Sequence, residues 1–86
     1  MTNFERYNAV QEIILKRAAE AFPKMVHLNY KNDFEVLTGD LKDCGEFVHA
    51  TLVSMAKVGK VDIVSDKADD GFSVVLTEDQ YANLSH

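Results

Sequence analysis

The sequence predicts an α+β fold in which two helices pack on one face of a four-stranded, mainly antiparallel sheet, forming a two-layer sandwich. Two segments carry apolar residues at every third or fourth position, which is the period of an amphipathic helix. Four short segments alternate apolar and polar residues, which is the period of a strand. The predicted order is α-β-β-α-β-β, with a possible short C-terminal helix. Because the connections are short, antiparallel hairpins are the simplest packing.

The length and composition indicate one domain. A chain of 86 residues buries roughly 60–65% of the surface that its unfolded form exposes, which is enough for one modest core. Its hydrophobic fraction of 47% and charged fraction of 27% are typical of globular proteins. We therefore expect a single domain over residues 1–86.

The first helix is expected from Thr2 to about Phe22. Thr2 and Glu5 have the spacing of a capping box, in which each side chain bonds an otherwise unpaired main-chain amide. Pro23 disfavours helical geometry at Phe22, so the helix should end there. The apolar stripe of this helix consists of Phe4, Tyr7, Val10, Ile14, Ala18 and Ala21.

A first hairpin is predicted from residues 25–30 and 34–37, joined by the polar turn 31–33. A second helix should begin after Thr38 or Asp40, either of which can cap it, and should end at Gly59. Its apolar stripe is Leu41, Cys44, Phe47, Val48, Leu52, Met55 and Ala56.

The last third of the chain predicts a second hairpin and a short helix. Strands are expected to begin at Val61 and at Phe72, on either side of the polar segment 65–71. Thr77 and Gln80 repeat the capping-box spacing, so a short helix carrying Tyr81 and Leu84 should follow.

Strand alternation assigns one sheet face to the helices and the other to the outside. The expected inner residues are Val26, Leu28, Tyr30, Phe34, Val36, Val61, Ile63, Phe72, Val74 and Leu76. The expected outer residues are His27, Asn29, Glu35, Leu37, Asp62, Val64, Ser73 and Val75. Leu37, Val64 and Val75 would form a small apolar contact surface, or would be covered by the C-terminal segment.

Charge is distributed unevenly along the chain. Residues 1–31 hold five basic and three acidic side chains, whereas residues 32–86 hold four basic and eleven acidic ones, within a net charge of −5. The acidic half repels nucleic acid, so no direct nucleic-acid binding is expected and a basic protein partner is favoured.

No pattern in the chain identifies a reaction or a metal site. The segment from Asp66 to Gly71 resembles a calcium loop, but Ala68 and Thr77 stand where ligands are needed. Cys44 and His49 are separated by about 140° around a helix, so they cannot act as a nucleophile and base pair. We expect no catalysis, no metal and no cofactor.

A cytoplasmic location is expected. The first apolar stretch is interrupted by charges and does not resemble a signal peptide, and no apolar run approaches the roughly 20 residues of a membrane span. The single cysteine, Cys44, has no partner for an internal disulfide, which agrees with a reducing compartment.

These observations predict a small acidic adaptor, inhibitor or immunity-type protein that docks a macromolecular partner. The expected partner-binding residues are Glu35, Leu37, Asp43, Glu46, Asp62, Val64, Asp69, Asp70 and Val75. One alternative is a structural or assembly protein that forms a homodimer or larger homo-oligomer through Leu37, Val64 and Val75. A second alternative is an enzyme or small-ligand sensor that uses His27, Asn29 and Glu35.

Overall fold

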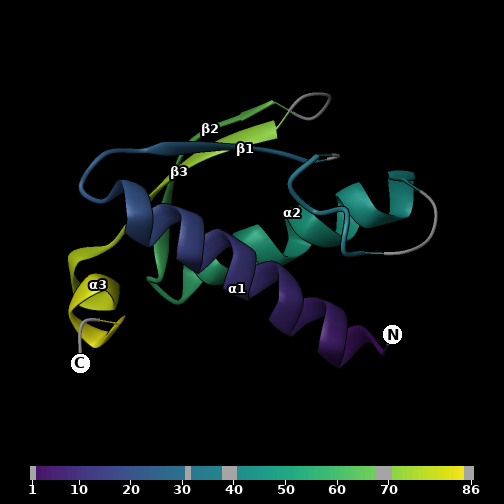
Figure 1. Ribbon diagram of the computed structural model, residues 1–86, viewed down its shortest axis with the longest axis horizontal. Coiled ribbons are helices and arrows are strands. Elements are labelled where there is room, and N and C mark those ends of the chain that lie inside the picture. Colours follow the sequence, from purple (N-terminus) through teal and green to yellow (C-terminus); the bar gives the residue numbers. More distant parts are fainter. Residues whose placement is uncertain (1, 31, 38–40, 68–70, 85–86) are drawn as a thin grey trace.

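The computed structural model describes residues 2–30, 32–37, 41–67 and 71–84, and these form a small α+β fold (Figure 1). Within them there are three helices and one three-stranded antiparallel sheet. The elements follow the order α1 (Asn3–Ala21), β1 (Val26–Asn29), α2 (Leu41–Lys57), β2 (Val61–Lys67), β3 (Gly71–Leu76) and α3 (Glu78–Leu84). None of the helices in the described ranges is both long and apolar enough to cross a membrane.

The first helix has the predicted boundaries and cap. The Glu5 amide donates to Thr2 Oγ1 at 3.1 Å, and the Thr2 amide donates to Glu5 Oε1 at 3.2 Å. The hydrogen bond from the Thr2 amide, followed by that from its hydroxyl, lowers the pKa of Glu5. The helix ends at Ala21, before Pro23. The capping-box prediction is therefore confirmed.

Both long helices and the sheet contribute to one core. The strand order is β1-β3-β2, so β3 lies in the centre and is paired on both sides. In Figure 1, α1 and α2 lie on the same side of the sheet. The buried apolar residues are Val10, Ile14 and Ala18 from α1; Cys44, Val48, Leu52 and Met55 from α2; and Leu28, Phe34, Leu37, Val61, Phe72, Val74 and Leu76 from the sheet and its connections.

The predicted fourth strand over residues 34–37 is not confirmed, because residues 32–36 form turns. The Leu37 amide donates to the Phe34 carbonyl at 3.1 Å. Side chains alternate between two faces only along extended backbone, so the faces predicted for residues 34–37 do not apply. Leu37, expected on the outer face, lies in the core at 7% exposed, whereas Val36, expected inside, is 50% exposed. Phe34 does point inward, with its ring 6.1 Å from that of Phe72.

A β-bulge at Val64 interrupts the pairing of β2 with β3. Ile63 lies opposite Val74, and the next paired residue, Ser65, lies opposite Ser73, so Val64 is an extra residue. One extra residue exchanges the two faces of a strand. Ile63, which precedes the bulge, still lies opposite the core residue Val74 and is 37% exposed. Asp66, which follows the bulge, now pairs with the core residue Phe72. The strand also continues to Lys67, into the segment predicted as a polar connection.

The predicted short C-terminal helix is present as α3. The Gln80 amide donates to Thr77 Oγ1 at 3.2 Å, which caps its first turn. Tyr81 stacks on Phe22 with ring centroids 4.2 Å apart, so α3 packs beside the end of α1 (Figure 1). None of its residues is buried. The ring contact of α3 is therefore with the end of α1.

Gly71 marks the closest approach of β3 to β1. A Cβ atom at this position would collide with the Leu28 carbonyl oxygen and lie 3.0 Å from the Asn29 Cα.

Gly71→Ala is therefore expected to lower the free energy of unfolding by about 2–3 kcal/mol, as overpacking does. The matched control is Gly45→Ala in α2, where a Cβ would meet nothing within 4 Å. Alanine should there stabilise the helix by up to about 1 kcal/mol. Chemical denaturation of both variants measures the contrast, and a neutral Gly71→Ala would contradict the described pairing of β1 with β3.

Candidate partner-binding surface

The sheet face turned away from the helices carries part of the predicted contact surface. Asp62 of β2 pairs with Val75 of β3, and the adjoining Val64 is 53% exposed. Asp62 is exposed and Val75 is half-buried. The structure therefore brings these three predicted residues together, as one acidic and two apolar side chains at the β2 side of the sheet.

The other predicted site residues lie elsewhere. Glu35 is exposed in the turns after β1, and Glu46 is exposed on α2. Leu37 is in the core and is not available to a partner. The Asp43 side chain, together with Asp69 and Asp70, lies outside the described residues.

The outer residues of β1 are engaged in polar contacts. His27 is exposed, and its Nδ1 lies 3.2 Å from Ser73 Oγ on the neighbouring strand. The Asn29 Oδ1 atom accepts a hydrogen bond from the Asn32 amide at 3.0 Å. Glu35 belongs to a different element, so the predicted trio of His27, Asn29 and Glu35 is not assembled on one strand pair.

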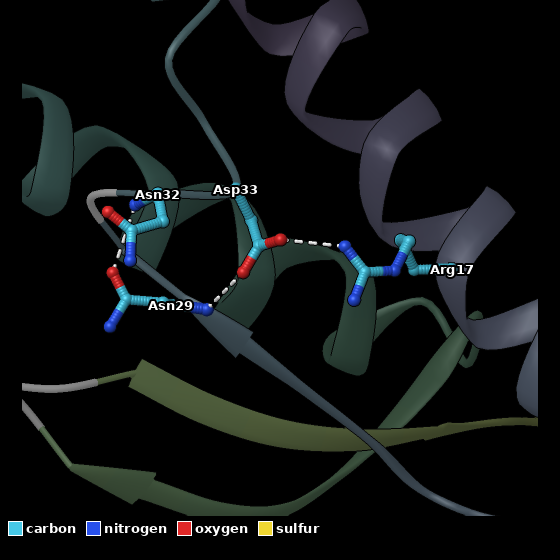
Figure 2. Close-up of polar contacts among 4 residues, drawn as sticks. All are labelled: Arg17, Asn29, Asn32 and Asp33. Atoms are coloured by element: carbon cyan, nitrogen blue, oxygen red, sulfur yellow. Dashed lines mark hydrogen bonds and ion pairs between the residues drawn. The ribbon is translucent and has the colours of Figure 1, made fainter.

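Asp33 bonds to Asn29, the last residue of β1, as Figure 2 shows. The Asn29 amide donates to Asp33 Oδ2 at 2.7 Å, and the Asp33 amide donates back to the Asn29 carbonyl at 3.2 Å. The Arg17 guanidinium holds the other carboxylate oxygen, Asp33 Oδ1, at 2.6 Å. Both main-chain polar groups of Asn29 are thus bonded on the side away from β3, so another strand cannot pair with β1 at this residue.

The same contacts determine the ionisation of Asp33. Partial burial raises the pKa of this carboxyl group, but the hydrogen bonds from the Asn29 amide and the Arg17 guanidinium, with the positive charge of Arg17, outweigh it. The pKa therefore lies below its ordinary value. Asp33 stays negatively charged, which keeps this edge contact intact at neutral pH.

The edge of β2 differs from that of β1. Every residue from Asp62 to Lys67 is exposed, and β2 pairs with β3 on one side only. Within the described ranges no strand pairs with its other side. An exposed strand edge offers main-chain donors and acceptors to a further strand.

Tyr30, His49 and Asp66 form a polar cluster that connects β2 to the end of β1 and to α2. The Tyr30 hydroxyl donates to Asp66 Oδ1 at 2.8 Å, and His49 Nδ1 lies 2.9 Å from Asp66 Oδ2. The Tyr30 ring packs against Phe72, with centroids 5.2 Å apart. Burial, then the hydrogen bond to Asp66 and its negative charge, raises the pKa of Tyr30 far above its ordinary value. The Tyr30 hydroxyl therefore stays protonated at neutral pH and donates to Asp66. We call this cluster of Tyr30, His49 and Asp66 the clasp.

Sequence reasoning missed this clasp. Its three residues come from the end of β1, from α2 and from β2, and none of them is close to another in the chain. Asp66 reaches the helix side of the sheet only because of the bulge at Val64. No feature of the strand alternation marks the bulge, so the sequence carried no signal for it.

The remaining chemistry-bearing groups have structural surroundings. Cys44 is buried as predicted, and Arg6 Nη2 lies 3.9 Å from its sulfur. Among the described residues, no group of three or more His, Cys, Asp or Glu side chains could hold a metal ion. A hollow of about 240 Å³ lies on the helix side and is lined by Tyr7, Phe47, Ala50, Thr51 and Ser54. None of the predicted site residues lines this hollow.

Asp33→Asn is expected to lower the free energy of unfolding by about 1 kcal/mol at pH 7, because a neutral amide accepts weaker hydrogen bonds from Arg17 and Asn29. The folded pKa of Asp33 is depressed, so the carboxylate's contribution is complete above the unfolded pKa of about 3.9 and is lost as the pH falls through the folded value. Denaturation curves of the variant and the wild type should therefore converge towards pH 2. Glu20→Gln, at an exposed position on α1, is the control. A difference that is the same at every pH would contradict the role of the charge.

Comparisons with known proteins returned no relative: the chain matches no protein-family model, no curated protein and no solved structure. Its function is therefore inferred from its own surface. The feature of that surface with the clearest physical meaning is the open edge of β2, exposed from Asp62 to Lys67, beside Val64 and Val75.

Proposed function

We propose that this chain is a small acidic protein-binding module of the adaptor, inhibitor or immunity type, which docks a basic macromolecular partner in the cytoplasm without catalysis. The observation that supports this proposal is the unequal engagement of its charges. Among the residues that the structure describes, several basic side chains are held in internal contacts, whereas most of the acidic residues are exposed.

Three basic residues are held in this way. The Arg6 guanidinium lies 4.5 Å from the centre of the Phe47 ring, and Arg17 is paired with Asp33. Lys60 Nζ donates to Gln11 Oε1 at 2.8 Å. The exposed acidic residues outside the helix cap and the cluster at Tyr30, in contrast, are Glu12, Glu20, Glu35, Glu46, Asp62, Glu78 and Asp79. The field felt by an approaching protein is therefore negative, which favours a positively charged partner and speeds its encounter.

Asp62, Val64 and Val75 are the proposed contact point for that partner. Interfaces combine an apolar centre with a polar rim, and these residues offer both within one strand pair. Glu35 and Glu46 lie on other elements and are proposed to contribute to attraction at longer range.

Affinity capture from native lysate, followed by titration with the purified partner, tests this proposal. We expect one stoichiometric basic partner whose dissociation constant rises steeply with salt. Asp62→Lys should weaken the complex about tenfold or more, because it reverses a charge at the contact. Glu20→Lys makes the same change of charge on the exposed face of α1 and should have a smaller effect. Capture of no partner, or binding that ignores both salt and Asp62→Lys, would refute the proposal.

A further inference from the structure

The open edge of β2 has an unusual spacing of main-chain groups. Before the bulge, the Thr77 amide donates to the Lys60 carbonyl at 3.3 Å, so Thr77 directs its amide towards β2, whereas the Lys60 amide donates to the Met55 carbonyl at 3.0 Å. Bonding directions alternate along an antiparallel ladder, so Val75 and Asp62 bond to one another and Ile63 directs its amide and carbonyl outward.

The pairing after the bulge follows from the unbroken register of β3 with β1. Because the Thr77 amide faces β2, alternation along β3 turns Val75, Ser73 and Gly71 towards β2 and Phe72 towards β1, where it pairs with Leu28. The Asn29 amide, which donates to Asp33, agrees with this phase. Phe72 therefore points its main-chain groups towards β1. Its partner on β2, Asp66, must then point outward, as Ile63 does.

The outward residues Ile63 and Asp66 are three positions apart, whereas those of a regular strand are two apart. A regular strand can match this edge on one side of the bulge only. A second copy of β2 running antiparallel matches it on both sides. Ile63 then lies opposite Asp66 of the second copy, and Asp66 lies opposite Ile63 of the second copy.

Charge supports the same register. When Ile63 lies opposite Asp66 of the second copy, Asp62 lies opposite Lys67 of the second copy. The two-fold symmetry of the dimer gives a second, identical pair. Asp62 pairs with Val75 and Lys67 pairs with Gly71, which places both on the outer face of the sheet. They occupy non-hydrogen-bonded positions, where cross-strand side chains are closest. A register shifted by one residue would instead place Asp62 opposite Asp66.

We propose that two copies of this chain associate through β2, so that their sheets join antiparallel into one sheet of six strands. The partner is a second copy, and the contact consists of the main-chain groups of Ile63 and Asp66 with two ion pairs between Asp62 and Lys67. The contact closes with two-fold symmetry, and Asp33 blocks further addition at β1. This inference is independent of the basic partner proposed above, because it concerns the purified chain alone.

Sedimentation equilibrium of the purified chain, from low micromolar to a few hundred micromolar, tests the proposal. The wild type should pass from monomer to dimer. Asp62→Lys and Lys67→Asp should each weaken the dimer about tenfold or more, because each places like charges opposite one another twice. The double variant Asp62→Lys with Lys67→Asp restores opposite charges and should recover the wild-type dissociation constant. Lys16→Asp and Glu20→Lys on α1 are the matched controls.

Amide hydrogen exchange locates the contact. The amides of Ile63 and Asp66 should become protected as the concentration rises, and the charge-reversed variants should lose that protection. The competing explanation is that the bulge and the exposed charges prevent association at this strand edge. It predicts a monomer throughout the concentration range. A strict monomer, a dimer indifferent to charge reversal, or protection confined to other elements would overturn the proposal.

Discussion

The extra residue at Val64 determines which side chains of β2 meet the helices and which meet solvent. Without it, Asp66 would share the outer face with Asp62; with it, Asp66 pairs with the core residue Phe72. The carboxylate then accepts hydrogen bonds from Tyr30 and His49. A partly buried tyrosine hydroxyl needs such an acceptor, since an unsatisfied polar group costs about 1–3 kcal/mol. The bulge therefore links the far end of the β2–β3 hairpin to β1 and α2.

The two edges of the sheet consequently have different properties. Asp33, held by Arg17, occupies the outer main-chain groups of β1 at Asn29. The edge of β2 remains exposed, and the bulge gives it a spacing that a second copy reproduces. The ion pair between Arg17 and Asp33 removes one charge of each sign, so it leaves the net negative charge of the surface unchanged.

Periodic features were predictable from the sequence, and irregular ones were not. The capping box at Thr2, the central positions of both helix stripes and the inward residues of β3 each repeat a local pattern that physics imposes. Phe4, predicted in the first stripe, lies near the start of α1 and is 74% exposed. The segment 34–37 is too short for alternation to distinguish a strand from turns, so Leu37 was placed on the wrong face. Asp62, Val64 and Val75 were correctly placed beside one another, whereas the clasp of Tyr30, His49 and Asp66 depends on a bulge that no local pattern reveals.

Cross-strand nuclear Overhauser effects between β2 and β3 test the register most directly. The described bulge predicts contacts that place Ile63 opposite Val74, Ser65 opposite Ser73 and Asp66 opposite Phe72, with Val64 unpaired between them. An uninterrupted ladder, with Ser65 opposite Phe72 and Asp66 opposite Gly71, would turn Asp66 away from Tyr30. That result would contradict the clasp and the self-complementary edge together.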